Sequence, residues 1–218
     1  TGTGANFVSA TGTFTNSGFG FVGGNAPLCV VGDDRSGKSV LWLGDSICAG
    51  KGFAKVSGIY PQTKNMVDLS FSDGEINSLN SSFGGSSLRE MMRQTISGGA
   101  RSRLKLIPYS DYVIDEHGTN DLAAGSTFLE LASDKLSLAA YVKRFGGRFV
   151  ITTITARVTT TNGCVTVASQ TVGSIETYRT QFNSWVRAGC PVNASGVADM
   201  AGNPSPLIYS YIDLAAAY

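Results

Sequence analysis

Short apolar runs alternate along the chain with longer segments in which apolar residues recur at helical spacing. The runs are three to eight residues long and rich in branched or aromatic side chains, which is typical of buried strands. They occupy residues 40–43, 112–114, 149–154 and 207–214, and residues 66–69 form a weaker candidate strand.

Three segments between these runs predict helices. In residues 127–145 leucine, alanine and valine recur roughly every three or four positions, and Gly146-Gly147 then favours a helix end. Residues 88–96 and 172–186 show shorter patterns of the same kind. Strands separated by helices predict an α/β protein with a parallel sheet, helices on both faces and right-handed crossovers.

Residues 1–38 differ from the rest of the chain. They are rich in Gly, Thr, Ser and Asn, and short apolar runs at 8–14, 19–22 and 28–31 predict strands joined by glycine turns. We therefore expect a β-rich N-terminal segment over residues 1–38 and one α/β domain over residues 39–218.

The composition narrows the class of protein. The 218 residues carry a net charge of only +1, with 15% charged and 42% hydrophobic side chains. Without a basic face the chain is not expected to bind nucleic acid, and no apolar stretch approaches the ~20 residues of a membrane span. Low charge with abundant Gly, Ser and Thr favours a secreted protein, and a start without Met favours a processed chain.

Four cysteines permit three complete pairings. Cys164 and Cys190 flank one predicted helix and are expected to form a disulfide, whereas Cys29 and Cys48 could pair or remain free core thiols. The sequence has no Cys-x-x-Cys motif and only one histidine, so we expect neither a metal nor a cofactor.

Three polar segments follow predicted strands or lead into a helix. Gly44-Asp45-Ser46 ends the first strand, residues 80–87 form a glycine loop before a helix, and residues 115–121 follow another strand. The carboxyl edge of an open α/β sheet is where ligands bind, so a hydroxyl there is a candidate for catalysis. Each segment, taken alone, could equally be an ordinary connection or a turn capped by its own Asn and Asp side chains.

In this order and spacing the three segments resemble the SGNH (GDSL-type) hydrolase family. Gly44-Asp45-Ser46 matches its first block, Gly85 its glycine block, and Gly118-Thr119-Asn120-Asp121 its Gly-x-Asn-Asp block. The resemblance implies a three-layer α/β/α, flavodoxin-like fold with Ser46 as the nucleophile. It also implies an oxyanion hole made by the N–H groups of Ser46 and Gly85, with Gly84 as the alternative, and by the Asn120 amide.

These residue types suit the attack of a serine on an ester. The developing oxyanion needs fixed, neutral donors, which glycine N–H groups and an asparagine amide can supply. Cys48 occupies the position of the second glycine in a Gly-x-Ser-x-Gly motif, so a lipase-type nucleophile elbow fits less well.

The sequence departs from the family at the general base. The family carries Asp-x-x-His after the last strand, but no histidine follows Asp199 or Asp213 here. For the only histidine, His117, we favour a role in lining the pocket or at the edge of the core. We expect the base to come from a separate C-terminal fragment that carries Asp-x-x-His and docks beside Ser46.

The sequence thus predicts a serine esterase that acts on small acyl esters. By analogy with the family, we expect O-acetyl groups on carbohydrate as substrates. The alternatives are a lipase or thioesterase of the same family, or a catalytically inactive carbohydrate-binding module.

Overall fold

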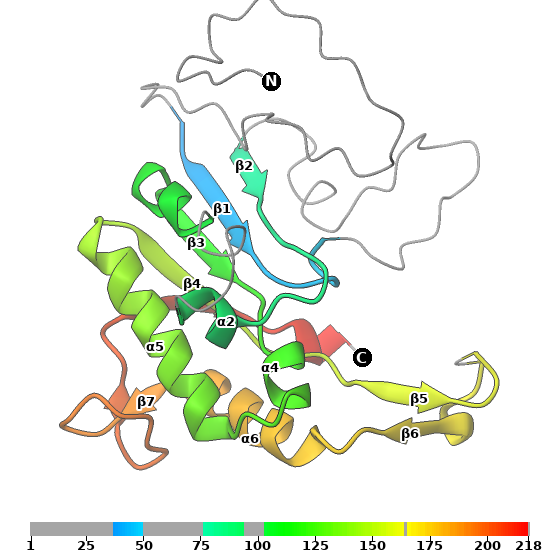
Figure 1. Ribbon diagram of the computed structural model, residues 1–218. Helices are drawn as coiled ribbons and strands as arrows, with labels where there is room; N and C mark the ends of the chain where they lie inside the picture. The colour runs from blue at the N-terminus through cyan, green and yellow to red at the C-terminus, as the bar shows by residue number, and fades with distance from the viewer. Residues whose placement is uncertain (1–36, 50–75, 94–102, 164, 218) are drawn as a thin grey trace, which may run out of the picture. The chain divides into compact units, whose positions relative to one another are not determined.

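The computed structural model describes residues 37–49, 76–93, 103–163 and 165–217. Its main sheet has five parallel strands in the order β2-β1-β3-β4-β9 (Figure 1). The strands are β1 Ser39–Leu43, β2 Asn77–Asn80, β3 Tyr112–Asp115, β4 Arg148–Thr152 and β9 Ile208–Ile212. This is the flavodoxin-like order 2-1-3-4-5, so the predicted α/β fold with a parallel sheet is confirmed.

The central strands are continuous apolar runs because both of their faces are covered. In β1, Leu41 and Leu43 are almost completely buried on one face, and Val40 and Trp42 are buried on the other. The strand lies between β2 and β3, so both of its edges are paired.

The described α-helices form a layer on one side of the sheet (Figure 1). They are α2 Leu88–Met92, α4 Thr119–Ala123, α5 Phe128–Arg144 and α6 Glu176–Arg187. The long helix α5 packs against β4 and the other three helices. It begins at a capping box between Thr127 and Glu130 and is followed by Gly146 with a φ of 79°, so its predicted bounds are confirmed.

An apolar cluster covers the other face of the sheet. Val40, Trp42, Ile114 and Val150 form it together with Cys48, and Tyr112 and Ile212 pack against it. Among the described residues, no α-helix is seen on this face in Figure 1, so helices on both faces stay a prediction. The 3-10 helix η2, Arg103–Tyr109, contacts β1, and the sequence pattern did not predict it.

Several short elements differ from the sequence-based expectation. β2 has the sequence Asn-Ser-Leu-Asn, which carries no strand pattern, and it is held through backbone pairing with β1. A hairpin of β5 Val158–Thr160 and β6 Gln170–Val172 precedes α6, which therefore begins at Glu176 rather than 172. β7 Pro191–Val192 pairs with β8 Asn203–Pro204, and η3 Val167–Ser169 and η4 Leu214–Ala217 are short 3-10 turns.

Some predictions concern residues that the structure does not describe. The strands expected within residues 1–38 and at 66–69 lie outside the described part of the chain, and the domain boundary at residue 38 stays a prediction. Within the described residues, no helix is long and apolar enough to cross a membrane.

The predicted disulfide between Cys164 and Cys190 is wrong, because Cys190 is a free, fully buried cysteine. It follows the end of α6, where its N–H donates to the carbonyl of Trp185. Position 164 lies outside the described residues. Cys48 is also a free, buried cysteine.

Candidate active site

Three loops meet at the carboxyl edge of the sheet, next to the point where the strand order reverses between β1 and β3. Ser46 follows β1, Gly84 and Gly85 follow β2, and Asn120 follows β3. In flavodoxin-like sheets this switch point is the expected ligand site, because the connections on its two sides diverge.

The loop after β1 is a tight turn held by Asp45. The Asp45 carbonyl accepts the N–H of Ala49 at 3.0 Å, and its side chain accepts the N–H of Ile47 at 2.8 Å. A Cβ atom at Gly44 would lie 2.7 Å from Glu116 Oε2, so only glycine fits where the strand ends. Ser46 is half-buried at the start of this turn.

The loop after β2 runs beside the first loop and then turns sharply. Phe83 donates its N–H to the Gly44 carbonyl at 3.1 Å, and Ser86 donates to the Phe83 carbonyl at 3.1 Å. Gly85 has a φ of +83° at the third position of this turn, which is typical of a type II turn. A Cβ atom on Gly84 would lie 3.9 Å from the Ser46 Cβ, so the glycine loop passes directly beside Ser46.

The loop after β3 joins the other two. Asn120, in the first turn of α4, donates from Nδ2 to the Ser86 carbonyl at 2.9 Å and makes a longer contact of 3.5 Å with Asp45 Oδ2. Gly118 begins this helix with a φ of +147°, and a Cβ there would lie 2.4 Å from Ile154 Cδ1. The structure therefore brings Ser46, the glycine loop and Asn120 together, as the order of the blocks predicted.

The loops leave backbone donors unused. No hydrogen bond involves the N–H groups of Ser46, Gly84 or Gly85, or the Ser46 hydroxyl, in the described part of the chain. Half-exposed or exposed donors of this kind are available to an anion that approaches Ser46.

Asp121 has a structural role. The sequence pattern alone did not distinguish this role from those of the other residues in the Gly-x-Asn-Asp block. Its two carboxylate oxygens accept the N–H groups of Leu88 at 3.1 Å and Arg89 at 2.8 Å. These are orphan donors at the start of α2, the helix that follows the glycine loop. Asp121 therefore fixes α2 and α4 to each other on the side of the site away from Ser46's own loop.

His117 does not line a pocket, which corrects one of the two roles favoured for it. Its side chain is fully buried, with Nδ1 2.6 Å from Asp115 Oδ1 and Nε2 2.9 Å from Ser86 Oγ. Both ring nitrogens are therefore engaged, and neither faces Ser46 as a base.

Two buried carboxyls lie under the first loop. Burial raises the pKa of Glu116 to about 8, and the charge of Asp45 adds to this effect. Burial likewise raises the pKa of Asp45 above its usual value. Glu116 Oε2 accepts the N–H of Asp45 at 3.2 Å, so this side chain supports the loop that carries Ser46.

Glu116→Gln is expected to remove part of the pH dependence of folding. In the folded chain the pKa of the Glu116 carboxyl is about 8, whereas in the unfolded chain the carboxyl has its ordinary pKa of 4.5. The unfolded state then binds fewer protons, so this group makes the free energy of unfolding fall as pH rises between these values. Glutamine stays neutral and still offers an oxygen to the Asp45 N–H.

The measurement is urea unfolding at pH 5 and pH 9. The Glu116→Gln variant should gain stability over the wild type at pH 9 and gain much less at pH 5. Glu90→Gln, at an exposed position on α2, is the matched control and should show no such difference. Equal pH dependence in Glu116→Gln and wild type would contradict the prediction.

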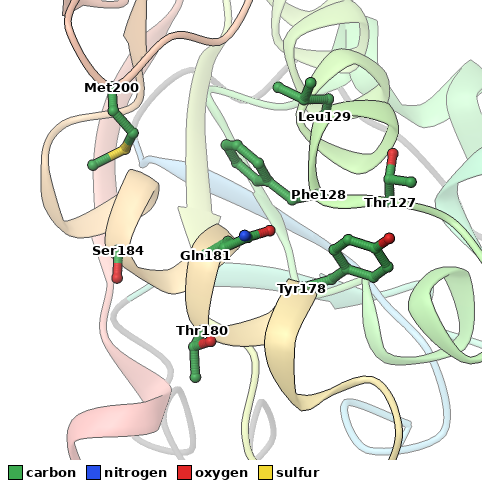
Figure 2. Close-up of a pocket in the computed structure, with 8 residues that line it drawn as sticks. All are labelled: Thr127, Phe128, Leu129, Tyr178, Thr180, Gln181, Ser184 and Met200. Atoms are coloured by element: carbon green, nitrogen blue, oxygen red, sulfur yellow. The ribbon is translucent and has the colours of Figure 1, made fainter.

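An open groove of about 630 Å³ lies between the start of α5 and α6, as Figure 2 shows. Its apolar lining comes mainly from Phe128, Leu129, Tyr178 and Met200. None of its residues belongs to the three loops that surround Ser46. Among the described residues, no group of three or more His, Cys, Asp or Glu side chains could hold a metal ion.

The fold and the site define an α/β protein with a serine, a glycine loop and an asparagine at the switch point of a parallel sheet. No family model and no curated protein matches the chain. Solved structures similar to it include the esterase EstA from Pseudoalteromonas sp., at 17% identity and a TM-score of 0.47, covering 81% of this chain and 77% of that one.

Two further solved structures are similar at the same level. One is a member of the lipolytic G-D-S-L family from Veillonella parvula, at 14% identity and a TM-score of 0.46, covering 69% of this chain and 71% of that one. The other is a mutant of Axe2, an acetyl-xylooligosaccharide esterase from Geobacillus, at 17% identity and a TM-score of 0.46, covering 70% of this chain and 71% of that one. The function proposed below rests on the residues of this chain.

Proposed function

We propose that the chain is an ester hydrolase of the SGNH (GDSL) type with Ser46 as its nucleophile. One observation carries the proposal: Ser46 lies beside the glycine loop, and the backbone N–H groups of Ser46, Gly84 and Gly85 have no acceptor among the described residues. Asn120 is tied to the same loop through the Ser86 carbonyl.

The reaction follows the usual course of acyl transfer to serine. Ser46 Oγ attacks the ester carbonyl carbon and gives its proton to a general base, so that the carbonyl oxygen becomes an oxyanion. The N–H groups of Ser46 and the glycine loop, with the Asn120 amide, donate to this oxygen. The tetrahedral species then expels the alcohol, which takes the proton back, and water hydrolyses the acyl-enzyme by the same steps.

Two glycines compete for the backbone donor in this scheme. Gly85 is the residue that the family's glycine block implies, whereas Gly84 is the one whose Cα lies next to Ser46. The positive φ of Gly85 gives it the separate task of forming the turn. Gly85 therefore remains the donor that the family resemblance implies. We propose Gly84 as the donor that lies closest to Ser46.

The general base has to come from outside the described residues in this scheme. His117, the one histidine of the sequence, is fully buried and engaged at both nitrogens. We propose that a further polypeptide segment carrying Asp-x-x-His supplies the base beside Ser46. Intact-mass analysis of active material should then reveal a second, histidine-containing peptide.

We further propose small O-acyl esters as substrates, with O-acetyl groups on carbohydrate as the first candidates, and a secreted location. Both proposals rest on the family resemblance and on the composition of the chain. A lipase or thioesterase would use the same catalytic groups but would prefer long-chain esters or thioesters. Rates with acetylated xylan, p-nitrophenyl palmitate and an acyl thioester separate these alternatives.

The direct test of the proposed function is labelling with a fluorophosphonate followed by peptide mapping. An activated Ser46 should carry the label, and Ser46→Ala should prevent it. In material that contains the segment supplying the base, no labelling together with no hydrolysis of p-nitrophenyl acetate would overturn the proposal and favour the alternative of an inactive carbohydrate-binding module.

Asn120→Ala is expected to lower kcat by roughly 10²–10³-fold with little change in KM. The reason is that its amide donates to the oxyanion mainly in the transition state. Steady-state kinetics with p-nitrophenyl acetate measure the effect. Thr119→Ala, at the neighbouring position of the same helix, is the control and should keep its rate within about twofold of the wild type. An effect confined to KM would make Asn120 a substrate-binding residue instead.

A further inference from the structure

A chain of buried polar side chains runs beneath the glycine loop. Asp115 accepts from His117 Nδ1 at 2.6 Å, and His117 Nε2 lies 2.9 Å from Ser86 Oγ. Arg103 donates from Nη2 to the same Ser86 oxygen at 2.7 Å. Lys135, on α5, forms an ion pair with the other carboxylate oxygen of Asp115. All five side chains are buried, so the network is sealed from solvent.

The contacts are compatible with one arrangement of protons. Arg103 can only donate, so Ser86 Oγ accepts from it and can donate its own hydrogen to His117 Nε2. In that arrangement His117 carries its proton on Nδ1, and the Asp115 carboxylate accepts it. Burial alone would raise the pKa of Asp115, but Lys135 and His117 hold it below its usual value, so the carboxylate stays charged.

Ser86 connects this network to the donors around Ser46. Its N–H closes the turn that contains Gly84 and Gly85, and its carbonyl accepts from the Asn120 amide. Its hydroxyl is held by His117 and Arg103 at the same time. One residue therefore fixes both the glycine turn and the asparagine that the proposed oxyanion hole requires.

We propose that His117 is a positioning residue, which acts through Ser86 to hold the glycine loop and Asn120 in place for the oxyanion. The effect of His117 on the oxyanion rests on the proposed function. The claim that His117 fixes the glycine turn rests only on the contacts described above. Asp115 and Lys135 orient the imidazole ring, and Arg103 holds the serine from the opposite side.

Ser86, His117 and Asp115 are bonded in the same order as a catalytic Ser-His-Asp triad. Their burial argues against Ser86 as a nucleophile. Ser86 is only 7% exposed and His117 is not exposed at all. A nucleophile must reach an ester carbonyl, whereas this hydroxyl is already held by two partners inside the protein.

The first arm of the test is NMR, which needs no activity. Because the chain has one histidine, its imidazole gives one assignable set of signals. The signals should show Nδ1 protonated and Nε2 unprotonated. His117→Gln should shift the amide signals of Gly84 and Gly85, which lie far from it in sequence, whereas Ser81→Ala should not.

The second arm is a double-mutant cycle on kcat. Ser86→Ala and His117→Gln should each lower kcat at least about tenfold and leave KM within about twofold, because a displaced donor weakens transition-state binding. The double variant should be no slower than the slower single variant, since His117 acts through Ser86. Ser86→Thr, which keeps the hydroxyl, should restore most of the rate.

Ser81→Ala is the matched control for both arms. Ser81 is a buried serine of the same loop whose hydroxyl has no hydrogen-bond partner among the described residues, so its loss should leave kcat unchanged. Additive effects of Ser86→Ala and His117→Gln, or unchanged glycine signals in His117→Gln, would overturn the positioning role. Fluorophosphonate on Ser86 in place of Ser46 would overturn it in favour of a Ser86 nucleophile.

The two proposals fail in different ways. If the wild-type protein, together with the segment that supplies the base, is neither labelled nor active, the proposed function fails, and the glycine signals of His117→Gln then decide the positioning role. If Ser46 is labelled but His117→Gln keeps its full kcat, the function stands and the positioning role fails.

Discussion

Ser46→Ala is expected to lower ester hydrolysis more than about 10³-fold while the chain stays folded. The rate falls because the attacking oxygen is removed, and the remaining donors can only stabilise attack by water. Folding should be unaffected because the Ser46 hydroxyl makes no hydrogen bond with any described residue. The free energy of unfolding should therefore change by less than about 0.5 kcal/mol.

The measurement is turnover of p-nitrophenyl acetate, with urea unfolding on the same samples. Ser81→Ala removes a buried hydroxyl from the neighbouring loop and serves as the control with full activity. A Ser46→Ala variant that kept more than a few per cent of the wild-type rate would show that another group is the nucleophile. Mapping of the fluorophosphonate label would then identify it.

Lys135→Met is expected to destabilise the chain by about 3–5 kcal/mol, the largest stability effect that we predict. Lys135 is completely buried and pairs with Asp115, which is also completely buried. Methionine fills similar space but leaves the Asp115 carboxylate with only His117 beside it. A buried charge that has lost its partner is far more costly than the intact pair.

The double variant Asp115→Asn with Lys135→Met tests the cause. Asparagine removes the charge and can still accept from His117 Nδ1 through its side-chain oxygen, so the double variant should recover much of the lost stability. Lys143→Met, at an exposed position of the same helix, should change the free energy of unfolding by less than about 0.5 kcal/mol. Equal destabilisation in the single and double variants would mean that lost packing, rather than the unpaired charge, is the cause.

The largest difference between sequence and structure concerns His117. Its position next to the Gly-x-Asn-Asp block suggested a residue at the pocket or the edge of the core. Its partner Ser86 is 31 residues away in sequence and Lys135 is 20 residues away from Asp115. Contacts between residues so far apart in sequence produce no periodic pattern of hydrophobic and polar positions. The buried network therefore became visible only in the tertiary structure, where the segments after β2 and β3 pack against α5.

Cys190 and β2 show two other ways in which a local pattern misleads. Two cysteines that flank a helix look like a natural pair, but one of them is turned into the core at the end of α6. The strand β2 has little apolar content because its ladder with β1 is made by backbone groups, which no side-chain pattern records.

The sequence by itself determined the alternation of strands and helices, and with it the parallel sheet. It also determined the three segments that meet around Ser46, because parallel strands place their carboxyl ends at one edge. These features arise from local periodicity and from chain order, which a sequence records directly. The tertiary structure decided which groups are left free and which are engaged: the unused N–H groups of Gly84 and Gly85, and the two bonded nitrogens of His117. Hydrogen-bond satisfaction depends on neighbours that only folding brings together, so it could not be read from the order of residues.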